Sequence, residues 1–372
     1  MHSISRRSVA GLLLLAACRA WCATPAQDCR RDLDDLPGFL LENDAGGKDA
    51  QARYGSAHFE AALAAAQSAA AAVKSDADCL PVLSKYLEAW RHGHLQVVPM
   101  ASTAPSVAAS GAAAGDDRLP AMRALSHDTL LLTLRSFNNG TREPLVRLLA
   151  SKREVLESHP NWIIDVRDNN GGMDSSYEPV MPWLMANDGL QVGTTLYVTP
   201  ANIAGWERVC LSSAPGDAEC ARNLAPFIDR MKAAKTGDYI SLRPGQDLLP
   251  SPADKSATHQ PRRVAILTDE ACGSSCEQFL LEARQSFSVK LVGRRTFGAL
   301  DVSNLRDHDL PSGKRRLFYA TTRSLRIPDQ PVDGIGVLPD IYLPRGKEAA
   351  APSDEIEHVR RWLEGGPLAP AN

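Results

Sequence analysis

Residues 262–300 have the sequence RRVAILTDEACGSSCEQFLLEARQSFSVKLVGRRTFGAL. An apolar run of strand length, 264–267, leads into a loop of small residues, 272–276, and then into an amphipathic helix that begins near Glu277. A serine at such a strand-to-helix turn presents its hydroxyl to solvent, and the N–H of the next residue lies beside it at the positive end of the helix. This geometry suits a nucleophile and half of an oxyanion hole. A Ser-Ser pair in a loop more often serves only as a helix cap.

Around this stretch, strand-like and helix-like segments alternate. The patterns predict strands at 129–137, 161–169, 194–200 and 264–269, and helices at 141–158, 177–185, 225–234 and after Ser275. Alternation of this kind is typical of an α/β domain in which helices cover a mainly parallel sheet. Ligands usually bind such a sheet at the carboxyl ends of its strands.

The chain before this domain has a different composition. Two segments, 59–75 and 79–93, are rich in helix formers or have apolar residues near a 3.6 period, and a strand-like piece follows Gly93. We therefore divide the 372 residues into an export signal (1–23), an N-terminal helical region (24–100), an Ala/Ser/Gly-rich flexible linker (101–118), a catalytic domain (119–347), and a C-terminal helix and tail (348–372).

The first 23 residues have the pattern of an export signal, with a basic start at Arg6 and Arg7, an apolar stretch, and small residues after it. The paired arginines also fit a twin-arginine signal, and 15–18 fits a lipoprotein cleavage box that would acylate Cys18. We expect an exported protein, either periplasmic or anchored to the outer membrane as a lipoprotein, or else secreted. Lipidation of Cys18 is the only membrane attachment that we expect, because no later segment has ~18 uninterrupted apolar residues.

The overall composition limits the class of protein. The chain is 44% hydrophobic, which is enough for a full core, and its net charge of −3 includes no long basic run. Nucleic acid is therefore not expected as a partner, because binding to phosphates needs a concentrated Lys/Arg surface. The sequence does not indicate an oligomeric state.

Six cysteines remain after the signal region, an even number that suggests disulfides in an exported chain. Proximity favours Cys210 with Cys220 and Cys29 with Cys79, and Cys272 could then pair with Cys276. The alternative for the last two is that they are small buried packing residues. We expect no metal, since no histidine lies at ligand spacing beside the Cys-x-x-x-Cys pattern.

A second loop follows the predicted strand at 161–169. There IIDVRDNNGGMD ends in Gly171-Gly172, which lets the backbone turn sharply and leaves N–H groups free to face an anion. The plain alternative is an ordinary strand-to-helix turn. A serine nucleophile also needs a base, and His92 and His94 lie where a helix breaks at Gly93 and a strand begins.

Together, four segments resemble the C-terminal processing peptidases, the serine peptidase family that includes tail-specific protease and the tricorn core. The segments are IDVRDNNGG, SSCE at 274–277, LVGRRTFG and GIGVLPDI at 334–341, in the family's order over about two hundred residues. The resemblance implies a crotonase/ClpP-like α/β core of sheet and helices, here preceded by the small helical region. It also implies a peptide or unfolded protein as substrate, with no cofactor. No PDZ-type module fits into 101–118.

The resemblance assigns roles to particular residues. Ser274 would be the nucleophile, and the oxyanion would rest on the N–H of Ser275 and that of Gly171 or Gly172. The lysine base of the tail-processing branch is replaced by Ala299. The tricorn-like branch uses a histidine instead, which matches His94 better than His92. Asp333, near GIGVLPD, is the nearest match to an acidic residue that supports the catalytic hydrogen-bond network, whereas Asp340 is expected to be a structural turn residue.

These roles predict an exported serine peptidase in which His94 takes the proton of Ser274 and an acyl-enzyme forms. A bridge between Cys272 and Cys276 would stiffen the loop that holds Ser274. Two alternatives stay open at this point. The chain could keep the peptidase fold but only bind peptides or small ligands, since fold does not imply function. A redox role for the two cysteines ranks last because their spacing is not Cys-x-x-Cys.

Overall fold

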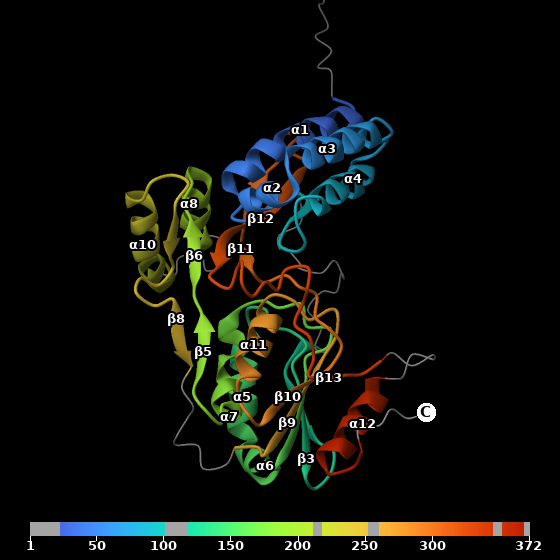
Figure 1. The fold of residues 1–372 in the computed structure, drawn as a ribbon, viewed down its shortest axis with the longest axis vertical. Helices are drawn as coiled ribbons and strands as arrows, with labels where there is room; N and C mark the ends of the chain where they lie inside the picture. The colour runs from blue at the N-terminus through green and yellow to red at the C-terminus, as the bar shows by residue number, and fades with distance from the viewer. Residues whose placement is uncertain (1–22, 101–117, 211–217, 252–259, 345–351, 368–372) are drawn as a thin grey trace, which may run out of the picture.

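The computed structural model describes residues 23–100, 118–210, 218–251, 260–344 and 352–367. The export signal predicted at 1–23 and the linker predicted at 101–118 lie almost wholly outside these residues. The described chain forms an upper helical region, a central antiparallel sheet and a lower, mainly parallel sheet covered by helices (Figure 1). The predicted α/β class with a helical N-terminal region is confirmed.

The N-terminal region consists of four helices that pack on one another. They are α1 (Pro25–Asn43), α2 (Gly47–Tyr54), α3 (Ser56–Ala70) and α4 (Asp76–Glu88). Thr24 and Ser75 cap α1 and α4 through capping boxes, which satisfy N–H groups that a helix start leaves free. Apolar side chains of α1, α3 and α4 form a core of their own, and the predicted Cys29–Cys79 disulfide joins α1 to α4 inside it.

The lower sheet has six strands in the order β13-β10-β9-β4-β3-β2. They are β13 (Ile341–Tyr342), β10 (Val289–Gly293), β9 (Arg263–Thr268), β4 (Asn161–Asp165), β3 (Thr129–Thr133) and β2 (Ala121–Ala124). All neighbours are parallel except β2 and β3. The middle residues of β3, β4 and β9 are apolar and buried because both faces of the sheet are covered. The predicted strands at 129–137, 161–169 and 264–269 are thus confirmed with shorter bounds.

Helices cover the two faces of this sheet unequally (Figure 1). The larger core, beneath one face, contains side chains of α5 (Arg142–Ser151), α6 (Arg153–Ser158), α7 (Met181–Leu184) and α11 (Ser275–Ala283), with the short turns η2 (Asp174–Ser176) and η3 (Glu178–Val180) beside them. The other face is covered by α12 (Pro352–Leu363). Parallel strands then direct their carboxyl ends, and the loops after them, to one edge.

The central sheet is antiparallel and was not anticipated. Its path is β1-β12-β6-β7, and β11 also pairs with β12. The strands are β1 (Gln96–Pro99), β6 (Thr194–Tyr197), β7 (Tyr239–Ser241), β11 (Val302–Asp309) and β12 (Arg315–Ser324). The ribbon β5 (Gly189–Val192) with β8 (Leu248–Ser251) and the helices α8 (Pro200–Glu207) and α10 (Ala218–Ala233) lie beside it. The predicted strand at 194–200 therefore belongs to this sheet and not to the parallel one.

All three predicted disulfides are present, since Cys210–Cys220 and Cys272–Cys276 form in addition to the bridge in the helical region. In the part of the chain that the structure describes, no helix is long and apolar enough to cross a membrane.

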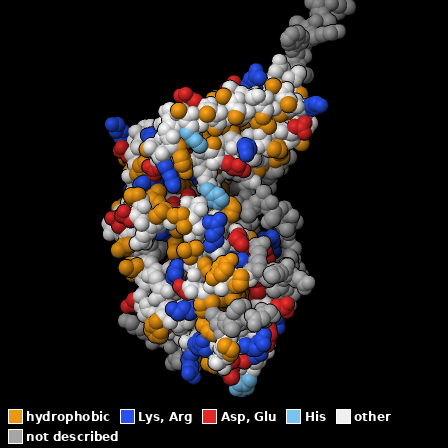
Figure 2. All heavy atoms as spheres, turned by 45° about the vertical axis from the view of Figure 1, so that its right-hand side comes forward, with side chains coloured by type: hydrophobic (Ala, Val, Ile, Leu, Met, Phe, Trp, Pro, Cys, Tyr) orange, Lys and Arg blue, Asp and Glu red, His pale blue; other side chains and the backbone are white. Residues whose placement is uncertain are grey.

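Lys and Arg side chains on the face shown in Figure 2 are interspersed with Asp, Glu and hydrophobic side chains.

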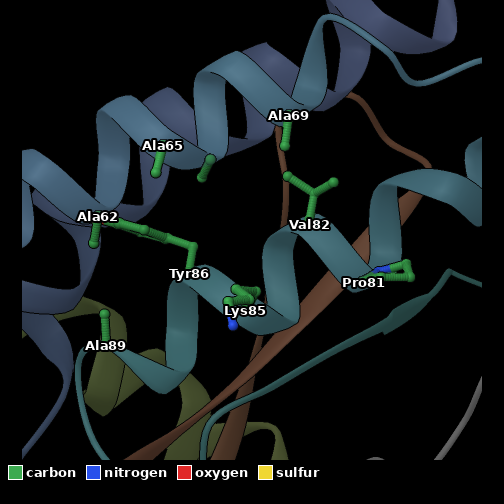
Figure 3. Close-up of a pocket in the computed structure, with 9 residues that line it drawn as sticks. Ala62, Ala65, Ala69, Pro81, Val82, Lys85, Tyr86 and Ala89 are labelled. Carbon is green, nitrogen blue, oxygen red and sulfur yellow. The ribbon is translucent and has the colours of Figure 1, made fainter.

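The helical region has a hollow between α3 and α4 of about 440 Å³. In Figure 3, Ala65 and Ala69 of α3 face Val82 of α4, and the Tyr86 side chain runs toward Ala62. The wall is formed almost entirely by small or apolar groups, with Lys85 as its one charged residue. None of the predicted site residues lines this hollow. Most of them lie on loops at the carboxyl edge of the parallel sheet.

Candidate active site

Three loops meet at the carboxyl edge of the parallel sheet. The loop after β4 contains Gly171 and Gly172, the loop after β9 contains Ser274, and the loop after β10 contains residues 296–299. The strands β4, β9 and β10 are consecutive neighbours in the sheet, so these loops lie side by side. The chain between α4 and β1 adds His94 from the N-terminal side.

Ser274 occupies the turn between β9 and α11 in an uncommon backbone conformation, with φ 58° and ψ −125°. The Glu277 carboxylate, fully buried one turn later, accepts a hydrogen bond from the Ser274 N–H at 3.1 Å. It also accepts from the Gly298 N–H at 2.7 Å, from the Ala299 N–H at 2.8 Å and from the Thr296 hydroxyl. Burial raises the pKa of Glu277, and these hydrogen bonds oppose that effect. Glu277 thus joins the serine loop to the loop after β10.

Two further contacts restrain the serine loop. The Cys272–Cys276 disulfide spans it, and both cysteines are fully buried in the core beneath α11. From the opposite side, Gly171 approaches so closely that a Cβ there would lie 2.5 Å from the Gly273 carbonyl oxygen and 2.7 Å from the Ser274 Cβ. Its φ of +93° also favours glycine. The Ser274 backbone is therefore held on both sides.

His94 lies on a turn that an ion pair holds in place. The Arg91 guanidinium donates to both carboxylate oxygens of Asp44, at 3.0 and 2.6 Å, and both side chains are buried. The same guanidinium donates to the carbonyl oxygens of Gly93 and His94. With φ values of 67° and 46°, Gly93 and His94 both adopt the left-handed region, and the clamp by Arg91 stabilises that conformation.

The imidazole of His94 lies between Ser274 and a backbone carbonyl. Its Nε2 is 3.2 Å from the Ser274 Oγ, and its Nδ1 is 2.6 Å from the Val302 carbonyl oxygen. A carbonyl can only accept, so Nδ1 carries the proton and Nε2 is left to accept one from the serine hydroxyl. Burial, reinforced by the charge of Arg91, lowers the pKa of His94 to about 4, although the bond to Val302 opposes this. The imidazole is therefore neutral at pH 7.

The other histidine considered from the sequence has a different position. His92 is exposed, its Nε2 is 3.0 Å from the Phe297 carbonyl oxygen, and its ring packs against that of Phe297. Ala299, which replaces the lysine of the tail-processing branch, is fully buried against the histidine turn. A Cβ at Gly93 would lie only 2.3 Å from the Ala299 Cβ. The space that a lysine would need is occupied by the turn that carries His94.

The candidate oxyanion donors lie on both sides of Ser274. Within the described chain, the N–H groups of Ser275 and Gly172 donate to no acceptor, whereas the Gly171 N–H donates to the Asn169 Oδ1 at 2.9 Å. The Ser275 Oγ donates to the Gly172 carbonyl at 3.1 Å and so joins the two loops. Of the two glycines, Gly172 therefore has the N–H that is left free for a ligand.

Asp333 makes no hydrogen bond to the imidazole. Its Oδ1 accepts from the N–H groups of Leu300 and Asp301, while the Asp301 carboxylate accepts from the N–H of Asp333 at 2.8 Å. Burial, together with the Asp301 charge, raises the pKa of Asp333 to about 7. This reciprocal pair fixes the segment just before Val302, so Asp333 reaches His94 only through the backbone. Asp340 instead accepts from Arg284 and the Leu291 N–H, as a structural residue would.

Several residues of the site could not be found from the sequence. Arg91 and Asp44 are separated by 47 residues, and the contribution of Val302 is a backbone oxygen, which no side-chain pattern indicates. Glu277 is part of a motif, but three of its four hydrogen bonds come from the loop after β10. The one sequence signal for Arg91 is its position, since this charged residue directly follows the apolar residues at the end of a helix and precedes His92 and His94.

The arrangement combines a serine hydroxyl, a neutral imidazole and two free N–H groups. Such a set can carry out acyl transfer, because the base activates the hydroxyl and the N–H groups stabilise the negative oxygen that develops. Among the residues with described positions, no group of three or more His, Cys, Asp or Glu could hold a metal ion.

Comparison with known structures identifies the fold. Mature CPAF superposes with a TM-score of 0.57 at 13% identity, covering 93% of this chain and all of that one. Mature CPAF complexed with lactacystin gives a TM-score of 0.59 at 13% identity, over 91% of this chain and 97% of that one. A protein from Parabacteroides merdae ATCC 43184, named as a candidate peptidase, superposes with a TM-score of 0.50 at 18% identity, over 94% of this chain and 98% of that one. A comparison with curated proteins found no match.

A family comparison agrees with the four motifs. The model of peptidase family S41 matches residues 128–343, more than half of the chain. The match includes the parallel sheet and the loops that contain Gly171, Ser274 and Asp333, while His94 precedes it. The resemblance inferred from the sequence is confirmed: the chain belongs to peptidase family S41, the serine peptidases.

Proposed function

We propose that Ser274 is the nucleophile of this peptidase and that His94 is its general base. The observation that carries the proposal is the 3.2 Å separation of the Ser274 Oγ and the His94 Nε2, with the opposite ring nitrogen bound to the Val302 carbonyl. This is the arrangement of nucleophile, base and orienting group that covalent catalysis needs. A carbonyl oxygen takes the orienting position that a carboxylate has in many other serine peptidases.

The reaction follows from the geometry. The Ser274 Oγ attacks the carbonyl carbon of the scissile peptide bond while its proton passes to the His94 Nε2. The tetrahedral oxyanion is stabilised by the N–H groups of Ser275 and Gly172, and removal of one such donor typically costs about 10²–10³ in turnover. The imidazolium then protonates the leaving amine, which departs and leaves an ester on Ser274. Water, deprotonated by the same imidazole, hydrolyses that ester and restores the serine.

Asp333 is assigned a positioning role in this scheme. Its carboxylate binds the N–H groups of Leu300 and Asp301 and so fixes the segment that leads to Val302. The Val302 carbonyl in turn determines the tautomer and the orientation of His94. A change at Asp333 therefore acts on catalysis through the imidazole.

The setting that we propose is outside the cytoplasm. Three disulfides are typical of an oxidising compartment, and the first 23 residues have the pattern of an export signal. Acylation of Cys18 would anchor the protein to the outer membrane, and without it the protein would be periplasmic or secreted. The substrates would be peptides or unfolded proteins that reach this compartment.

The test compares three variants of the mature protein with the wild type on a fluorogenic peptide mixture and on unfolded casein. Ser274→Ala and His94→Ala should lose cleavage by several orders of magnitude. His92→Ala should retain it, because that exposed ring contacts only the Phe297 region. Cleavage that persists in Ser274→Ala would exclude the proposed nucleophile. A folded wild type that binds peptides without cleaving them would instead support the alternative of a non-catalytic peptidase fold.

A further inference from the structure

A cavity of about 200 Å³ is lined by residues that contact or follow the loops of the proposed active site. Gln278, which lines it, is four residues after Ser274 on α11, and its N–H donates to the Ser274 carbonyl at 3.1 Å. Leu300, next to the loop that Glu277 binds, forms another part of the wall. On a helix, residues four apart share a face. The cavity therefore borders the first turn of α11, which begins at the proposed nucleophile.

The inner wall of this cavity contains a buried cation, Arg326, which is only 8% exposed. Its Nη1 donates to the Gln278 Oε1 at 3.1 Å, and its Nε lies 3.5 Å from the Asp301 Oδ1 without a hydrogen bond. No described residue accepts a hydrogen bond from its Nη2. A buried guanidinium that retains a free donor is costly unless an acceptor completes it.

The outer wall adds a second cation. Arg243, after β7, is exposed and lines the cavity, and its guanidinium makes no hydrogen bond or ion pair in the described part of the chain. Much of the remaining wall consists of amides and hydroxyls, among them Gln191 and Ser303. Val192, Leu242, Leu249 and Leu300 add apolar surface that can contact the methylene groups of a side chain, and the polar groups can bind its end.

Two carboxylates lie near these cations: Asp301 forms an ion pair with Arg326 at 3.5 Å, and Asp174 lines the cavity itself. Asp174 lines the cavity at its catalytic end, where it interacts with the hydroxyl of Ser275. Desolvation by the surrounding protein and the charge of Glu178 raise the pKa of its carboxyl, although the residue is exposed. The hydroxyl of Ser275 and the charge of Arg326 lower that pKa. Asp174 thus lies beside Ser275, whose N–H is a proposed oxyanion donor, while Arg326 and Arg243 are the two cations of the wall.

From this arrangement we propose that the cavity is the specificity pocket and receives a substrate side chain that ends in a carboxylate, with Arg326 and Arg243 as its partners. Glutamate fits better than aspartate because its carboxylate extends past Asp174. The inference rests on the function proposed above, since it assumes that Ser274 is the nucleophile. It adds what that function leaves open, namely the chemical class of residue that precedes the bond to be cut.

The test uses four fluorogenic peptides that differ only in the residue before the scissile bond: Glu, Gln, Leu or Lys. Wild type should have the highest kcat/KM for Glu, about tenfold or more above Gln and higher still above Lys, because hydrogen bonds between charged groups are the strong ones. Arg326→Gln should remove most of this preference. Arg243→Glu, a change at an exposed side chain without a hydrogen bond or ion pair, should reduce the preference for Glu and raise kcat/KM for the Lys peptide. Arg361→Glu, an equal charge reversal on α12, should leave it unaltered.

Labelling of Ser274 by a small fluorophosphonate, measured on the same samples, separates the two proposals because the reagent does not need the pocket. A wild type that labels but prefers Leu or Lys, or does not discriminate among the four peptides, overturns the pocket assignment and leaves the serine peptidase intact. A Glu preference that survives both Arg326→Gln and Arg243→Glu overturns it as well. A wild type that fails to label contradicts the proposed function itself.

Discussion

The carboxylate of Glu277 binds the N–H of Ser274, so a buried acid and the proposed nucleophile are joined through the backbone at 3.1 Å. The same carboxylate also binds the N–H groups of Gly298 and Ala299, and Ala299 packs against the turn that carries His94. Glu277 therefore connects the serine side of the site to the histidine side. Because the group is fully buried, each oxygen must receive its hydrogen bonds from the protein.

We predict that Glu277→Gln lowers both stability and turnover. A carboxamide has one oxygen, so its NH₂ group would face N–H donors that the carboxylate now satisfies. The expected loss is about 2–4 kcal/mol in the free energy of unfolding, measured with urea. Glu154→Gln, at an exposed position on α6, is the matched control and should change stability by less than about 0.5 kcal/mol. A Glu277→Gln variant as stable and active as wild type would exclude the linking role.

A second prediction concerns the close approach of Gly171 to Ser274. Gly171→Ala places a Cβ 2.7 Å from the Ser274 Cβ, so the serine loop must shift, and we expect turnover to fall by about 10²-fold or more. Gly140→Ala is the matched control, since Gly140 also has a positive φ (+99°) but open space around its Cβ. It should lose some stability and keep its turnover. Equal loss of turnover in both variants would assign the effect to backbone strain alone.

The disulfide that spans the serine loop gives a third prediction. The double variant Cys272→Ala/Cys276→Ala should fold, but its rate of reaction with a fluorophosphonate should fall by about tenfold or more, because the loop is no longer held in one geometry. The corresponding double variant at Cys210 and Cys220, outside the site, should react at the wild-type rate. If the two double variants react equally fast, the bridge within the loop contributes nothing to positioning Ser274.

The pH profile of kcat/KM tests the state of the base. Because the pKa of His94 is lowered to about 4, the imidazole remains neutral well below pH 6.5. The loss of activity that belongs to His94 should occur as the pH falls through that low pKa, since imidazolium cannot accept the serine proton. The pKa of Asp333 is raised to about 7, and its charge interacts with those of Asp301 and Arg91. Its titration should therefore add a second inflection to the pH profile, which Asp333→Asn removes. An acid limb near pH 6.5 that persists in Asp333→Asn would contradict a buried neutral His94.

The sequence was most informative where the signal is local. Strand and helix periodicity predicted the parallel strands β4 and β9, and motif order placed Ser274 at the turn between β9 and α11. The sequence left open whether Cys272 and Cys276 pair or are only buried packing residues, and the structure contains the disulfide. His94 was preferred over His92 on motif fit, and the structure places His94, and not His92, within 3.2 Å of the Ser274 Oγ.

What the sequence could not predict depends on contacts between distant segments. The antiparallel sheet joins β1 to β12, and the clamp of Arg91 by Asp44 joins α4 to the end of α1. The choice between Gly171 and Gly172 required knowing that Asn169 already occupies the Gly171 N–H. The arginines of the proposed pocket follow β12 and β7, far from any motif. Such relationships arise from tertiary packing and leave no periodic pattern in the chain.

The most direct test of the account is the mass of the intact mature protein after reaction with a fluorophosphonate, followed by peptide mapping. We predict one adduct per molecule, located on Ser274, formed far more slowly in His94→Ala and absent in Ser274→Ala. Labelling at another serine, or a folded wild type that acquires no adduct, would contradict the assignment of Ser274 and His94 as the catalytic pair.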